Sequence, residues 1–157
     1  MQLYLVRHAE QVSEREDPAQ PISAVGREAI DRVAHQLASS GCCRPVEIRH
    51  SIKLRAQQTA ERLALQLGQV PLRKIDGLAP LDDVEPLADG LVDERNDLML
   101  VGHLPHLNRL ASLLVAGDAD AGLFSFPTAA AACLQRQKQS DAGRWVLAWM
   151  ILPDLLD

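Results

Sequence analysis

The sequence has 157 residues, of which 47% are apolar, so we expect one domain, residues 1–157, with a sizeable core. The net charge of -5 argues against general affinity for nucleic acid, which requires clustered Lys and Arg. The longest apolar runs, such as Leu98–Val101 and Trp145–Leu152, fall short of the roughly 20 residues of a membrane-spanning helix. Arg7 interrupts the apolar start before it reaches the length of a signal peptide. We therefore expect a cytoplasmic protein that binds neither nucleic acid nor membranes.

The beginning of the chain predicts a strand and then a helix. Gln2–Val6 is a short apolar run that ends at Arg7 and His8, as a buried strand does when it reaches the edge of a sheet. Ser23 can cap a helix that ends at Gly41. The apolar face of this helix is expected to consist of Ile30, Val33, Ala34, Leu37 and Ala38.

The next segment repeats this order of elements. Val46–His50 is a second strand candidate, and a helix is expected from about Leu54 to Gly68. Its apolar face consists of Ala56, Ala60, Leu63, Ala64 and Leu67. Arg55 therefore lies in the first turn of a helix that follows a strand.

The rest of the chain continues the alternation and ends in a hairpin. The expected elements, in order, are a strand at Val70–Ile75, a helix at Val84–Asp93 with Pro86 near its first turn, a strand at Asp97–Val101, a helix at Leu107–Val115, and strands near Ala130–Gln135 and Trp145–Leu152 around the polar turn Ser140–Gly143. This pattern predicts an α/β fold with a mainly parallel, mixed sheet covered on both faces and an antiparallel addition at its end.

Four residues with phosphate chemistry are expected to meet at the carboxyl ends of the strands. Arg7 and His8 follow the first strand, Arg55 begins a helix, and His103 follows the strand at Asp97–Val101. Ligands of open α/β sheets bind at this edge. Two guanidinium groups and two imidazoles suit phosphate, since Arg binds its oxygens in a bidentate way, and a neutral imidazole nitrogen is a competent nucleophile.

Each of these residues also has an ordinary structural explanation. An Arg-His pair after a strand is common at the start of a loop, and Arg55 can belong to a solvated helix face. We assign His50 and His106 to such ordinary loop or surface roles. A metal site built on His103 and His106 lacks an obvious third ligand, and no cofactor is expected. The three cysteines have no zinc or disulfide spacing, so we expect reduced thiols.

Four blocks of the sequence resemble the histidine phosphatase superfamily, which includes the phosphoglycerate mutases. They are Leu3–Glu10 (LYLVRHAE), Pro21–Gly26, Ser51–Ala60 and Leu100–His106. The Arg-His-Ala form and the short chain look most like the SixA phosphohistidine phosphatases. The resemblance implies a phosphoglycerate mutase-like, three-layer αβα sandwich without an inserted lid domain.

The same resemblance implies roles for the site residues. His8 would be the phosphorylated nucleophile, Arg7 and Arg55 would bind the phosphoryl oxygens, and His103 would be the second histidine of the pocket. These are the roles that the residue types suggest by themselves.

The general acid of many superfamily members has no clear counterpart here, although Asp82, Asp83 and Glu85 are candidates. A phosphohistidine can lose a protonated imidazole, whereas an alkoxide leaving group benefits from a positioned acid. We therefore expect a phosphohistidine phosphatase whose partner is a phosphohistidine-bearing protein, such as a phosphotransfer domain. The alternatives are a phosphatase of a small phosphomonoester and a non-catalytic phosphate-binding module.

Overall fold

The computed structural model describes residues 1–137 and 144–156. Its elements, in chain order, are β1 (Gln2–Arg7), α1 (Ala24–Ser40), β2 (Glu47–His50), α2 (Leu54–Gln66), β3 (Leu72–Lys74), α3 (Glu85–Val92), β4 (Leu98–Gly102), α4 (His106–Ala116), β5 (Ala131–Arg136), β6 (Trp145–Ile151) and the short 3₁₀ helix η1 (Pro153–Leu155). The expected strands and helices are all present, with ends that differ by a few residues. The expected turn at 140–143 lies outside the described residues.

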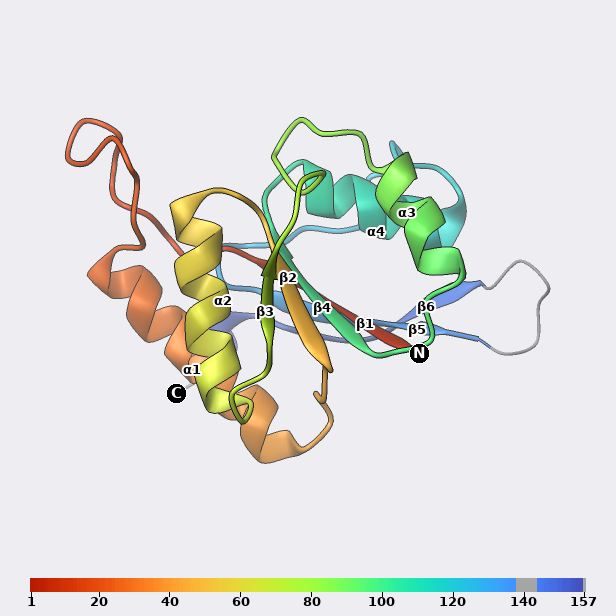
Figure 1. Cartoon of the computed structure of the whole chain (residues 1–157), viewed down its shortest axis with the longest axis horizontal. Coiled ribbons are helices and arrows are strands. Elements are labelled where there is room, and N and C mark those ends of the chain that lie inside the picture. Colours follow the sequence, from red (N-terminus) through yellow and green to blue (C-terminus); the bar gives the residue numbers. More distant parts are fainter. Residues whose placement is uncertain (138–143, 157) are drawn as a thin grey trace.

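The strands form one six-stranded mixed sheet in the order β3-β2-β4-β1-β5-β6. β1, β2, β3 and β4 are parallel to one another, whereas β5 is antiparallel to β1 and β6 is antiparallel to β5. Parallel strands require crossover connections, which α1, α2 and α3 lie within, while β5 and β6 pair as the expected hairpin. The four parallel strands therefore all end at the same edge of the sheet (Figure 1).

Helices cover both faces of the sheet, which gives the three layers expected from the sequence. Side chains alternate along β1: Tyr4 and Val6 belong to the core under α1 and α2, whereas Leu3 and Leu5 belong to the core under α3 and α4. Figure 1 shows the two helix pairs on opposite sides of the sheet. Both faces of β1 are thus buried, which explains its continuous apolar sequence.

The first helix begins and ends where its capping residues indicate. The Ser23 hydroxyl accepts a hydrogen bond from the Gly26 N–H at 2.9 Å, and Gly41 closes the helix with a left-handed φ of 65°. Ile30 is fully buried against the sheet, but Ala38 is exposed, so its assignment to the apolar face was wrong. Ala38 lies in the last turn of the helix, where Leu37 is the residue that packs into the core.

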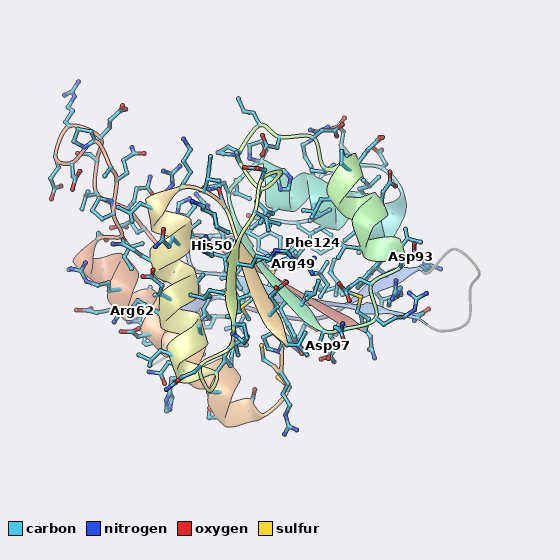
Figure 2. The ribbon with its side chains drawn as sticks, in the orientation of Figure 1. Arg49, His50, Arg62, Asp93, Asp97 and Phe124 are labelled. Carbon is cyan, nitrogen blue, oxygen red and sulfur yellow. The ribbon has the colours of Figure 1, made fainter. Side chains whose placement is uncertain are left out.

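Polar contacts connect neighbouring elements within the helix and sheet layers. The Arg62 side chain of α2 donates to both Asp31 carboxylate oxygens of α1, and the Gln2 N–H donates to Asp97 Oδ1 at 2.6 Å. Figure 2 shows Asp97 at the amino end of the sheet and His50 at the carboxyl end. β3 spans only three residues because it is an exposed edge strand with a single neighbour.

The segments that follow the carboxyl ends of the parallel strands are loops and helix beginnings. In the described part of the chain, α2 and β4 are separated only by β3, α3 and their loops, with no inserted lid domain. In residues 1–137 and 144–156, no helix is long and apolar enough to cross a membrane.

Candidate active site

The structure brings the four predicted residues to the carboxyl edge of the sheet. Arg7 is the last residue of β1, His8 follows it, and His103 follows β4. The His8 N–H donates to the Gly102 carbonyl at 3.0 Å, which extends the pairing of β1 with β4 and places the two histidines side by side. Their ring centroids are 4.8 Å apart, with an angle of 52° between the planes. Arg55 lies in the first turn of α2.

The hydrogen bond of His8 determines which of its ring nitrogens is free. Nδ1 lies 2.8 Å from the Ala9 carbonyl oxygen, and because a carbonyl only accepts, Nδ1 must carry the proton. Nε2 of the neutral ring then has an unshared electron pair. The pKa of His8 is lowered to about 4, mainly by burial and also by the charges of Arg55 and Arg7, while the hydrogen bond to Ala9 acts in the opposite direction. His8 is therefore neutral near pH 7.

His103 is also neutral and is held by Ser51. Its Nε2 lies 2.9 Å from the Ser51 hydroxyl, while its Nδ1 is buried and has no hydrogen-bond partner among the described residues. The pKa of His103 is lowered to about 3, mainly by burial and also by electrostatic repulsion from neighbouring groups such as Arg55 and Lys53. The Ser51 N–H donates to the Val101 carbonyl at 3.1 Å, so β2 and β4 together position this pair.

The two arginines are anchored by one end of each guanidinium group. Arg7 Nη1 donates to the Phe126 carbonyl at 2.7 Å, and Arg55 Nη1 donates to Gln20 Oε1 at 3.0 Å. The Nε atoms of both arginines are buried without a partner in the described part of the chain. Burial lowers the pKa of both groups. Since a buried donor costs free energy unless it is bonded, these N–H groups are suited to the oxygens of an anion.

Three residues that support the site were not assigned roles from the sequence. Thr59 is fully buried: its hydroxyl accepts from the Ala9 N–H at 3.0 Å and donates to the Arg55 carbonyl at 2.7 Å. Gln20, which holds Arg55, has a φ of 49° that is uncommon outside glycine. Ser51 holds His103. A polar residue in each of these places carries no periodic signal, so only the structure reveals these contacts.

The structure corrects our assignment of His50 and His106 to loop or surface roles. His50 ends β2 and is buried, with its Nδ1 donating to the Ser51 carbonyl at 2.9 Å. His106 begins α4 and is fully buried, and neither ring nitrogen has a hydrogen-bond partner in the described residues. Burial lowers the pKa of His106, and the nearby Asp82 carboxylate opposes this effect. No cluster of three or more potential metal ligands occurs in residues 1–137 and 144–156.

The three candidate acids lie in different surroundings. Asp82 and Asp83 line a cavity of about 560 Å³ that Ser51 also lines, so they lie near His103. Glu85 instead lines a separate cavity between α3, α4 and the start of β6. The Asp82 carboxylate accepts the Ala79 N–H at 2.8 Å. Of the three, Asp82 and Asp83 are therefore placed nearer to the site.

Solved structures share the fold of this chain. The SixA protein histidine phosphatase complexed with tungstate aligns with a TM-score of 0.84 and 22% identity over 99% of both chains. A putative SixA phosphohistidine phosphatase from Agrobacterium tumefaciens gives 0.77 and 24% over 97% of both chains. A mycobacterial glucosyl-3-phosphoglycerate phosphatase in complex with VO3 gives 0.75 and 18% over 94% of this chain and 97% of that one. These likenesses confirm the phosphoglycerate mutase-like fold.

Sequence comparison identifies the family. No curated protein sequence matches this chain significantly. The sequence profile of the histidine phosphatase superfamily (branch 1) matches residues 3–82, which include Arg7, His8 and Arg55 and end before His103. This match covers half of the chain and agrees with the fold. The chain belongs to the histidine phosphatase superfamily.

Proposed function

We propose that this chain removes the phosphoryl group from phosphohistidine on a protein, and that His8 carries that group between two steps of the reaction. The observation that supports this most directly is the hydrogen bond from His8 Nδ1 to the Ala9 carbonyl, which leaves the Nε2 electron pair free. The depressed pKa of His8, about 4, keeps this electron pair available at neutral pH. A neutral, oriented imidazole beside two arginines is what a phosphoryl-accepting nucleophile requires.

In the first step, Nε2 of His8 attacks the phosphorus of the substrate. A P–N bond to His8 forms while the P–N bond to the substrate imidazole breaks. The substrate imidazole, protonated on its other ring nitrogen, leaves as a neutral molecule, so the protein need not supply a proton. The N–H groups of Arg7 and Arg55 stabilise the charge on the equatorial oxygens during transfer.

In the second step, a water molecule attacks the phosphorus of phospho-His8. The bond to Nε2 breaks, the water supplies the oxygen and protons of the released phosphate, and His8 returns to its neutral form. His103 assists both steps. The Ser51 hydroxyl bonds His103 Nε2 at 2.9 Å, and in the tautomer in which this hydroxyl donates, His103 Nδ1 carries a proton that it can donate to a phosphoryl oxygen.

Two further observations support a protein substrate. The carboxyl edge carries no inserted lid domain in the described part of the chain, so a histidine on another protein's surface can approach His8. The structure that aligns with the TM-score of 0.84 is a protein histidine phosphatase.

A second candidate function is the hydrolysis of a small phosphomonoester. Its support is the placement of Asp82 and Asp83 in a cavity shared with Ser51, where a carboxylic acid could protonate an alkoxide leaving group. A structure with a similar fold is a glucosyl-3-phosphoglycerate phosphatase. This reaction would depend on the acid, whereas phosphohistidine hydrolysis would not.

The test compares a phosphohistidine-bearing phosphotransfer domain with a panel of small phosphomonoesters. We expect the wild type to hydrolyse phosphohistidine, His8→Ala to be inactive, and His35→Ala, which changes an exposed histidine of α1, to retain full activity. Activity confined to small esters and lost in Asp82→Asn would favour the second function. Binding of phosphate without any turnover would favour a phosphate-binding module.

A further inference from the structure

A cavity next to the proposed phosphate site has a lining of opposite charge, and we call it the acidic cavity. It measures about 560 Å³, and its lining includes the carboxylates of Asp76, Asp82 and Asp83 together with Ile52, Ile75 and Leu87. Ser51 also lines it and bonds His103, so the acidic cavity adjoins the site. The loop between β3 and α3, which supplies the carboxylates, lies at the carboxyl end of the sheet (Figure 1).

The lining of the acidic cavity has carboxylates but no cationic side chain in the part of the chain that the structure describes. None of its three carboxylates forms a salt bridge among the described residues. His106 interacts electrostatically with Asp82, but it is fully buried and does not line the acidic cavity. Burial lowers the pKa of His106, which disfavours its positively charged form. The carboxylates are therefore available to attract a positively charged group that enters the cavity.

Apolar side chains complete the surface. Ile52 is 52% exposed and lies on the rim, and Leu81, on the same loop as the carboxylates, is 88% exposed. Exposed aliphatic side chains of this size beside a reaction site are typical of contacts with another protein. A small anionic metabolite would instead be repelled by three carboxylates.

We propose that the acidic cavity binds the stretch of the substrate protein next to its phosphohistidine, and that this stretch carries a Lys or Arg side chain among apolar residues. This inference rests on the proposed function and adds the partner's chemistry to it. The phosphoryl group enters the cationic site while the neighbouring cation enters the acidic cavity. The two adjacent regions thus recognise a phosphate and a positive charge at a short, fixed separation, which gives specificity more than affinity.

The test uses two phosphohistidine peptides that are identical except that the residues flanking the phosphohistidine are Lys in one and Glu in the other. The double variant Asp76→Asn/Asp83→Asn reduces the acidic cavity from three carboxylates to one, that of Asp82. Asn retains an acceptor for the Glu85 N–H that Asp83 now bonds at 3.2 Å. The matched control is Asp89→Asn/Asp93→Asn, which removes the same charge from exposed positions beside the other cavity.

For the wild type we expect kcat/KM to be about tenfold higher for the Lys peptide, as one or two partly screened ion pairs would provide. The double variant should reduce this ratio to about twofold, and the control should keep it. Addition of 0.5 M salt should reduce the wild-type ratio as well. Equal rates for both peptides, or an unchanged ratio in the double variant, would overturn this inference alone. Hydrolysis of neither peptide by the wild type would overturn the proposed function too.

Discussion

The hydroxyl of Thr59 joins the residue after His8 to the helix that carries Arg55. It accepts from the Ala9 N–H at 3.0 Å and donates to the Arg55 carbonyl at 2.7 Å, in a fully buried position. The proposed nucleophile and one of the proposed phosphate ligands are therefore held at a fixed separation by one side chain that touches neither substrate nor phosphate. Thr59 is a positioning residue in this arrangement.

Thr59→Val should reduce both stability and activity. Valine has nearly the same shape but leaves the Ala9 N–H buried without an acceptor, which costs about 1–3 kcal/mol of unfolding free energy. kcat should fall while the KM for phosphohistidine changes little, because Ala9 orients His8. Urea denaturation and steady-state kinetics measure the two effects. Thr59→Ser retains the hydroxyl and should restore most of kcat, and a Ser variant as slow as the Val variant would contradict the proposed role of the hydroxyl.

The pH dependence of activity should reflect the depressed pKa of His8. The folded-state pKa is about 4, below the ordinary value of 6.5, so His8 stays neutral as the pH falls through 6.5 and is protonated only near 4. The acid limb of kcat/KM, which reports the free enzyme, should therefore lie well below 6.5. An acid limb centred at 6.5 would show that His8 titrates normally.

This pH profile needs a folding control. A buried histidine with a lowered pKa binds its proton more readily in the unfolded state, so its contribution to stability is present above pH 6.5 and is lost as the pH falls towards the folded-state pKa. His8 and His103 both act in this direction. Circular dichroism at each pH separates loss of fold from protonation of the nucleophile.

Gly26→Ala should destabilise the protein strongly. A Cβ at this position would lie 2.2 Å from the carbonyl oxygen of Glu10, a backbone atom that cannot move without shifting the loop after His8. We expect a loss of more than about 2 kcal/mol, as for other overpacked buried sites. The matched control is Gly90→Ala in α3, where nothing lies within 4 Å of the new methyl group and helix propensity should stabilise by about 0.5–1 kcal/mol. Similar melting temperatures for the two variants would contradict the close approach.

Arg55→Lys should preserve the charge but lose the geometry. The three N–H donors of Lys sit on one nitrogen, so they cannot reproduce the planar guanidinium that bonds Gln20 with one nitrogen and directs others at phosphate oxygens. We expect kcat/KM to fall by about 10²-fold, the usual cost of one lost oxyanion donor. Inhibition by inorganic phosphate should weaken in parallel. The matched control is Arg62→Lys. Arg62 lies further along α2 in a surface ion pair with Asp31, so this variant should retain wild-type kinetics.

Patterns with a clear period predicted the fold well. The first helix was predicted from Ser23 to Gly41 because capping and periodicity agree there, and the structure confirms both ends. β3 was predicted over six residues but spans three, because an edge strand with one neighbour has little to define its ends. The placement of Arg7 and His8 at the carboxyl edge followed from the abrupt end of an apolar run.

The contacts of single polar residues could not be predicted from periodic patterns in the sequence. Thr59 and Gln20 make their contacts with residues 50 and 35 positions away, and no local spacing encodes such pairs. His106 was treated as an ordinary surface or loop residue because an isolated histidine carries no signal of burial. The roles of the four central residues stay predictions, and His8→Ala and Arg55→Lys test two of them.

The position of β4 in the sheet determines when the site can form. β4 pairs with β1 on one side and with β2 on the other, although it follows both by many residues in the chain. During synthesis, β1 and β2 therefore emerge from the ribosome without the strand that joins them. His8, Ser51 and His103 meet only after β4 has inserted between its neighbours. A nascent chain that ends before this strand would contain the proposed nucleophile and both arginines, yet it would have no phosphate pocket.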